Sequence, residues 1–177
     1  TLYSIKPAFQ NMLRPLARHL VGMGATANGV TLTAAIVSVT AGLLLAIYHQ
    51  NPMVFWIVPV VSLSRMALNA IDGMMAREFG QASQLGMYLN ELTDIISDAA
   101  LILPFALVPI IPAWSVVIFA ILAALTEYAG VLGVMAGGAR RYDGPLGKSD
   151  RALALGIIAV LIATGANWPN VFFWIFI

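Results

Sequence analysis

Cysteine is absent from the 177 residues, histidine occurs only twice, and charged residues make up only 10% of the chain. The absence of cysteine excludes disulfides and thiolate metal sites. His19 and His49 are far apart in the sequence, which argues against a histidine-built zinc site. Any metal must therefore be held by oxygen atoms. The formal net charge of +1 gives no indication of nucleic-acid binding, so no nucleic-acid partner is expected.

Hydrophobic residues, by contrast, make up 60% of the chain and fall into long runs. Such a composition is typical of a polytopic membrane protein. Because a helix needs about 20 residues to cross about 30 Å of hydrocarbon, we predict one all-α membrane domain over residues 1–177, with six transmembrane helices from residue 30 onward. Five spans are expected at 30–48, 53–75, 85–107, 114–135 and 152–164, and residues 168–177 begin the sixth. The fifth run is short, so its helix must include residues 148–151.

The first 25 residues precede this bundle and have a different pattern. Ile5, Phe9 and Leu13 recur at helical spacing, with basic residues between them. This pattern predicts an amphipathic helix that lies on the membrane surface and contacts lipids. The alternative is a simple lead-in to the first span.

Basic residues indicate the orientation of the chain. Three precede the first span, one lies between the second and third, and four lie between the fourth and fifth: Lys6, Arg14, Arg18, Arg77, Arg140, Arg141, Lys148 and Arg151. The other connections contain no lysine or arginine. By the positive-inside rule, the N-terminus and the basic loops face the cytoplasm, as expected for a multi-pass protein of a bacterial inner (plasma) membrane.

Several acidic residues lie within or beside the apolar runs, where four acids facing lipid would cost about 10 kcal/mol. Helical spacing places four polar residues of the third span on one face: Asn90, Glu91, Asp94 and Asp98. A face of the second span likewise gathers Asn69, Asp72, Gly73 and Ala76. Because the connection between these spans is short, we expect them to be antiparallel neighbours whose polar faces meet.

Packed together, these acids would repel one another unless one or two divalent cations neutralised them. Oxygen ligands suit Mg²⁺, Mn²⁺ or Ca²⁺, so we predict a metal site at Asn69, Asp72, Asn90, Glu91, Asp94 and Asp98. The alternative is that the acids pair with Arg65, Arg77 or backbone donors and only orient the helices. Arg65 and Glu127 also lie within spans, and we expect a buried structural pair between them.

The two polar faces resemble the signature of the CDP-alcohol phosphatidyltransferases, D-x2-D-G-x2-A-R-x8-G-x3-D-x3-D. The chain keeps every spacing. It keeps six of the eight residues, Asp72, Gly73, Ala76, Arg77, Gly86 and Asp94, and has Asn69 and Asn90 at the other two positions. The resemblance implies a six-span bundle with a juxtamembrane helix. It also implies transfer of a phosphatidyl group from CDP-diacylglycerol to an alcohol, with release of CMP, in phospholipid biosynthesis.

Carried over by position, the resemblance makes Asp72 a metal ligand and Asp94 both a ligand and the general base. The implied contacts with the CDP-lipid are Asn28, Thr31, Gly73, Ala76, Arg77, Ser83 and Gly86. The family holds two divalent cations with four aspartates, and this chain departs from that pattern.

Two signature aspartates are replaced here by Asn69 and Asn90, so the expected metal affinity falls. Glu91 and Asp98 lie on the same face and restore the number of acids to four. We therefore predict an active, divergent branch of the family.

The most polar stretch, residues 139–156, leads into the fifth span. Its basic residues suit a negatively charged acceptor such as a sugar or polyol phosphate, and they are Arg140, Arg141, Lys148 and Arg151. The alternative is a role in topology and lipid headgroup contact. Gly133 and Gly137 make a small-xxx-small pair, which suits packing within the subunit or in an expected homodimer.

Two other functions compete with a transferase. One is a catalytically inactive relative that binds CDP-lipid, and the other is a cation or proton transporter whose carboxylates line an ion path. The sequence disfavours a transporter, because it has neither acids near the outer face nor a matching pair of broken spans.

Overall fold

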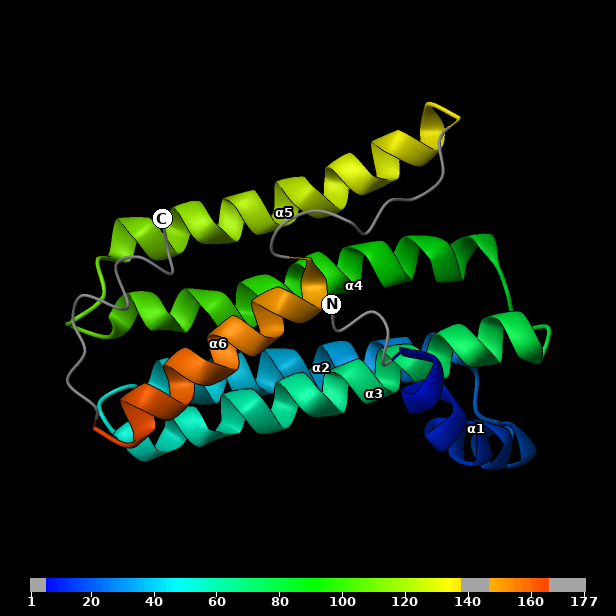
Figure 1. Cartoon of the computed structure of the whole chain (residues 1–177), viewed down its shortest axis with the longest axis horizontal. Helices are drawn as coiled ribbons and strands as arrows, with labels where there is room; N and C mark the ends of the chain where they lie inside the picture. The colour runs from blue at the N-terminus through cyan, green and yellow to red at the C-terminus, as the bar shows by residue number, and fades with distance from the viewer. Residues whose placement is uncertain (1–5, 138–146, 166–177) are drawn as a thin grey trace.

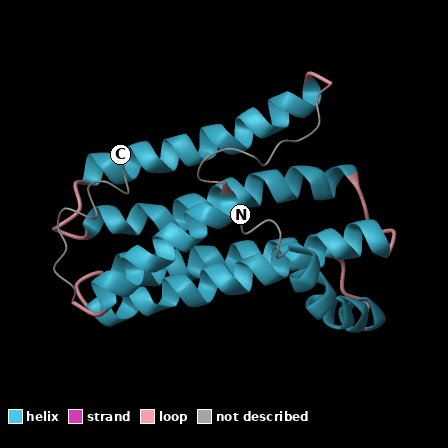
Figure 2. Cartoon of the chain, viewed as in Figure 1, coloured by secondary structure: helices cyan, strands magenta, loops and turns pink. Residues whose placement is uncertain are grey.

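A computed structural model of the chain describes residues 6–137 and 147–165, and every regular element within them is helical (Figures 1 and 2). The elements are α1 (Lys6–Gly22), α2 (Ala27–Ile47), η2 (Pro52–Trp56), α3 (Ile57–Glu78), α4 (Gln84–Ile102), η3 (Leu103–Leu107), α5 (Ala113–Met135) and α6 (Lys148–Ala163). The all-α prediction is confirmed.

The helices follow the predicted spans closely, and α6 does begin at Lys148, as the short fifth run required. By length and composition, three of the described helical segments can cross a membrane: Ala27–Ile47, Pro52–Glu78 and Ala113–Met135. α4 contains three acidic residues and α6 has 16 residues, so neither meets the same criterion. The expected sixth span at 168–177 lies outside the described residues, and the six-span count stays a prediction.

The helices α2, α3, α4 and α5 run along the length of the molecule, and α6 crosses them obliquely (Figure 1). α1, the start of α2, the α3–α4 connection and the end of α5 lie at one end, on the right in this view. The connections 48–56 and 103–112 lie at the opposite end. Arg14, Arg18 and Arg77 therefore share one end of the bundle, as the alternation of basic loops predicted. Its orientation toward the cytoplasm stays a prediction.

α2 is the central packing helix and contacts both α3 and α4. A Cβ atom on Gly42 would lie only 2.2 Å from the carbonyl oxygen of Ala100, so glycine is what allows α2 and α4 to approach this closely. As expected, the polar faces of α3 and α4 meet, through side-chain contacts of Arg65 and Asn69 with Asp94, although the closest backbone contacts of α4 are with α2. The short connection makes them antiparallel, but α2 lies against both.

The apolar core gathers toward the end that contains η2 and η3. Phe55 and Phe105 are fully buried, and their ring centroids lie 5.3 Å apart in an edge-to-face arrangement. Val58, Leu101 and Ile158 extend this core between the helices. On the outside, α5 exposes many large apolar residues, including Ile118, Ile121, Leu122 and Leu125, as expected for a lipid-facing helix.

α1 is helical as predicted and packs one face on α3. Ala17 is fully buried, and Leu13 and Leu20 pack beside it. Arg14 on the outer side forms an ion pair with Glu78, with 2.8 Å between Nε and Oε2. α1 is therefore docked on the bundle by apolar contacts.

Candidate active site

Asp72 lies on α3, where it is buried although its side chain is ionisable. The hydroxyl of Thr31 on α2 donates a hydrogen bond of 2.6 Å to Oδ2 of Asp72. Thr31 sits in the first turns of α2, which begins after Thr26 because the Thr26 hydroxyl accepts a hydrogen bond from Gly29 N. The position of Asp72 is thus fixed by two helices.

Asp94 and Asp98 project from α4 toward α3, where Arg65 contacts both. Arg65 Nη2 donates to the backbone oxygen of Asp94 over 3.0 Å and lies 3.3 Å from its Oδ1, and Nη1 pairs with Oδ1 of Asp98. Asn69 also faces this group, with its amide nitrogen 3.4 Å from Oδ1 of Asp94. The polar faces of α3 and α4 therefore meet through long side chains rather than through close helix packing.

α6 brings two basic residues into the same region. Lys148, the first residue of the helix, places its Nζ against Oδ2 of Asp94. One turn later Arg151 Nη2 lies 2.9 Å from Oδ2 of Asp98 and 2.6 Å from Oε1 of Glu127 on α5. These ion pairs join six side chains, here called the charged network: Arg65, Asp94, Asp98, Glu127, Lys148 and Arg151.

The charged network corrects the predicted pair between Arg65 and Glu127. Arg65 instead binds Asp94 and Asp98, and Glu127 binds Arg151. The correction has a simple cause: helical spacing indicates which residues share a face, but not which helix that face meets.

The charged network also bears on two residues with predicted ligand roles. Each carboxylate oxygen of Asp98 faces a guanidinium, one from Arg65 and one from Arg151. This arrangement favours a structural role for Asp98 over the predicted role as a metal ligand. Arg151 has a side chain only 5% exposed, so its contacts likewise favour a structural role over acceptor binding.

The predicted nucleotide-binding residues line the end of the bundle near α1. Arg77 folds back along its helix, so that a Cβ on Gly73 would lie 2.9 Å from its guanidinium, and Ala76 is half-buried beside them. Ser83 caps α4 by accepting a hydrogen bond of 3.0 Å from Gly86 N. A Cβ on Gly86 would lie 2.7 Å from Oδ1 of Asn28. Glycine at these two positions therefore makes room for polar side chains.

Four other predicted residues complete the list. Asn90 and Glu91 lie on α4, one turn before Asp94, and both are half-buried. Arg140 and Arg141 lie outside the described residues, so their predicted acceptor contacts stay predictions.

The site offers several oxygen donors for a divalent cation. Asp72 and Asp94 offer carboxylates, and Asn69 and Asn90 can offer amide oxygens, a set that suits Mg²⁺ or Mn²⁺. Across residues 6–137 and 147–165, no group of three or more histidine, aspartate or glutamate side chains gathers to hold an ion. Mg²⁺ in proteins commonly uses one or two carboxylates together with water and substrate phosphate. The residues therefore fit one such ion and not a cluster that requires several shared carboxylates.

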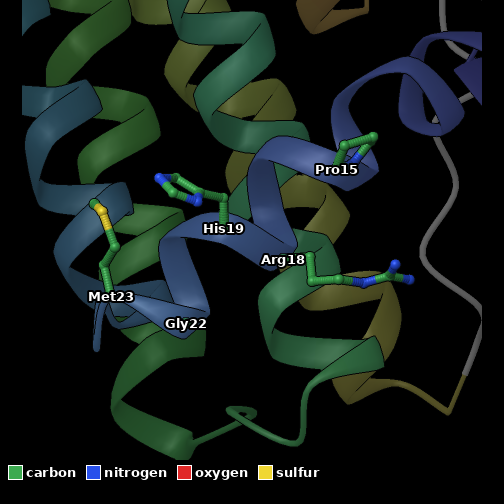
Figure 3. Close-up of a pocket in the computed structure, with 5 residues that line it drawn as sticks. All are labelled: Pro15, Arg18, His19, Gly22 and Met23. Carbon is green, nitrogen blue, oxygen red and sulfur yellow. The ribbon is translucent and has the colours of Figure 1, made fainter.

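A separate pocket lies on the surface of α1, lined by Pro15, Arg18, His19, Gly22 and Met23 (Figure 3). Arg18 and His19 point to opposite sides of the helix in this view, so their basic groups do not converge on one point. None of the signature residues lines this pocket. It is distinct from the candidate active site.

Comparison with known proteins assigns the family. The family model of the CDP-alcohol phosphatidyltransferases matches residues 25–177, which is most of the chain. The chain belongs to this family. The CDP-alcohol phosphatidyltransferase resemblance carried by the signature residues is thereby confirmed.

Individual relatives agree with this assignment. The chain is 46% identical over 168 residues to inner membrane protein YnbA of Escherichia coli K12, covering 95% of this chain and 83% of that protein. It is 29% identical over 106 residues to archaetidylinositol phosphate synthase of Pyrococcus horikoshii, covering 60% of this chain and 54% of that enzyme. The name of the first relative and the apolar helices together indicate a membrane protein.

The fold has also been seen in crystals. Two structures of phosphatidylinositol phosphate synthase from Mycobacterium tuberculosis, one with manganese and citrate and one with CDP-DAG bound, each superpose with a TM-score of 0.74. Sequence identities are 22% and 23%, and the matches cover 93% and 94% of this chain and 79% and 84% of theirs. This likeness establishes that the chain shares their fold.

Proposed function

We propose that the protein is a membrane transferase that moves a phosphatidyl group from CDP-diacylglycerol to an alcohol or alcohol phosphate, with release of CMP, in phospholipid biosynthesis. The observation that carries this proposal is the arrangement of Asp72 and Asp94. Both are buried, they come from the antiparallel helices α3 and α4, and they hold the signature spacing of the family. The crystal structure of a relative with CDP-DAG bound supports the lipid substrate.

In this proposal Asp94 is the general base. The acceptor hydroxyl oxygen forms a bond to the phosphorus that carries the diacylglycerol, and the bond from that phosphorus to the CMP oxygen breaks. The acceptor proton passes to the Asp94 carboxylate, and CMP leaves with the electron pair. Arg65 and Asn69 hold Oδ1 of Asp94, so the carboxylate is oriented before the acceptor arrives.

The nucleotide end of the substrate is assigned to the end of the bundle near α1. Arg77 is exposed there and suits a phosphate, because a guanidinium can donate two parallel hydrogen bonds. Gly73 and Gly86 let Arg77 and Asn28 lie close to the helix backbone, Ala76 adds only a small side chain beside them, and Asn28, Thr31 and Ser83 supply polar groups at the border of the nucleotide. Arg14 and Arg18 on α1 and Arg77 at the end of α3 lie at this end, which supports a cytoplasmic active site and N-terminus.

A bound Mg²⁺ or Mn²⁺ would neutralise negative charge that develops on the pyrophosphate. Asp72 and Asp94 would hold it, with amide oxygens from Asn69 and Asn90. Asn69 would have to turn its amide, since its nitrogen now faces Asp94. The relative solved with manganese supports a divalent ion.

An inactive CDP-lipid-binding relative is the second candidate. It is favoured by two observations, the asparagines at positions 69 and 90 and the ion pairs that already engage Asp94. A transporter has no comparable support from the described residues.

The test is CMP release by purified full-length protein. CDP-diacylglycerol and Mg²⁺ or Mn²⁺ are supplied with a panel of polyols, amino alcohols, and sugar or polyol phosphates. At least one acceptor is expected to give CMP, and Asp94→Asn is expected to lower the rate at least about 100-fold. Asp150→Asn is the matched control, because Asp150 is an exposed acid in the first turn of α6.

Each alternative has its own result. CMP release that survives Asp94→Asn would remove Asp94 as the base. Binding of CDP-diacylglycerol without CMP release from any acceptor would favour the inactive relative.

A further inference from the structure

We propose that Lys148 is a permanent cation of the active site, which takes the place of one divalent ion and leaves room for only one other. This inference rests on the proposed function, because it assigns a role within that same site. It differs from the acceptor-binding role that the sequence predicts for Lys148.

The position of Lys148 carries the inference. Its Nζ contacts Oδ2 of Asp94, and Asn69 contacts the other oxygen of the same carboxylate. The ammonium therefore lies among the oxygen donors that would otherwise bind a metal. Its side chain is 33% exposed, so most of its length is held by protein.

The backbone around Lys148 is anchored as well. Lys148 opens α6, which packs on α3, and Arg151 one turn later is tied to Asp98 on α4 and Glu127 on α5. The N-terminal end of a helix adds a partial positive charge of its own. Four helices thus fix a concentration of positive charge beside Asp94.

The charge balance of the described residues leaves room for few added cations. The charged network contains three carboxylates and three cationic groups, so it is neutral by itself. Asp72 adds one negative charge beside it, and Glu91, half-buried one turn before Asp94 on α4, adds another. One divalent ion balances these two charges, whereas a second would leave a positive excess in the substrate-free site.

The sequence changes agree with this balance. Asn69 and Asn90 stand where the family signature has aspartates, and each replacement removes a negative charge. An ammonium is a compact point charge with three donors, and it suits two carboxylates where a second metal would lack ligands. The loss of two carboxylates and the presence of Lys148 are therefore complementary.

The experiment counts Mn²⁺ bound to the detergent-solubilised full chain, by the electron paramagnetic resonance signal of the free ion. The wild type and the Asn69→Asp/Asn90→Asp variant are compared with and without Lys148→Met. With both aspartates restored, removal of Lys148 is expected to raise binding from one ion to two. In the wild-type background, Lys148→Met is expected to tighten the single ion about tenfold, because a neighbouring positive charge is lost. Lys148→Arg keeps the charge and should match the wild type.

Equal Mn²⁺ stoichiometry and affinity with and without Lys148 would overturn the inference. A rise in the acceptor KM of Lys148→Met with unchanged Mn²⁺ binding would assign Lys148 to the acceptor instead. Lys148→Gln repeats the test with a polar, uncharged side chain if the methionine variant does not purify as a folded protein. Mn²⁺ binding needs no turnover, so this inference can fail while CMP release is observed, and the proposed function can fail while the Mn²⁺ result holds.

Discussion

At the end of the bundle that contains η2 and η3, Phe55 and Phe105 meet in an apolar core. Near the middle of α3 and α4, by contrast, Arg65 is also buried but contacts two carboxylates. The apolar end is held by packing, and a change there costs mainly volume and contacts. The charged network is held by ion pairs, so the loss of one member leaves an unbalanced charge buried among the remaining ones. The network is thus the costlier region to alter, which suits a site that must keep a fixed geometry.

The largest effect is expected from Arg65→Met. Its side chain is 8% exposed, and its removal leaves Asp94 and Asp98 without a shared partner. We expect the free energy of unfolding to fall by about 3–5 kcal/mol. Unfolding by SDS in mixed micelles measures this change.

Arg65→Lys is the matched variant, because it keeps the charge but loses the fork that reaches both acids. Its cost should lie between those of the wild type and Arg65→Met. An Arg65→Met protein as stable as the wild type would mean that the network contributes little to the fold.

A smaller effect is expected from Gly42→Ala, toward the apolar end. The added methyl group would meet the backbone of Ala100, which cannot rotate away as a side chain can. We expect a loss of about 1–3 kcal/mol in the free energy of unfolding, with Mn²⁺ affinity unchanged.

Gly22→Ala is the control, since nothing lies within 4 Å of a Cβ at Gly22. This variant should be neutral or slightly stabilising. If Gly42→Ala altered Mn²⁺ affinity as strongly as Arg65→Met, the apolar end and the charged network would not be independent.

The helices and the apolar end were largely predictable from the sequence. Hydropathy marks where each helix lies, and the short fifth run indicated that its helix begins at Lys148. The 3₁₀ segments η2 and η3 were not predicted, because their residues are as apolar as the helices they join. Packing order was missed too, since the position of α2 against α3 and α4 depends on a close contact at Gly42.

The charged network and Asp72 beside it were predictable only in part. Signature spacing identified Asp72 and Asp94, and both are buried on facing helices. The partners of Arg65 and Glu127 were wrong, and the contact of Lys148 with Asp94 was not foreseen. Lys148 and Asp94 are far apart in sequence and α6 crosses the bundle obliquely, so no local pattern indicates that they meet (Figure 1).

The smallest effect is expected from Arg14→Gln, a charge change outside both the apolar end and the charged network. Arg14 and Glu78 are 37% and 38% exposed, and an ion pair so open to water and salt contributes little. α1 should stay docked through Ala17, Leu13 and Leu20, so no resolvable change in the unfolding midpoint is expected at low or high salt. A drop of several degrees that vanishes in concentrated salt would instead mean that charge holds α1 on the bundle. The different effects of Arg14→Gln and Arg65→Met on stability would then depend on where each residue lies across the membrane, and not on how buried it is.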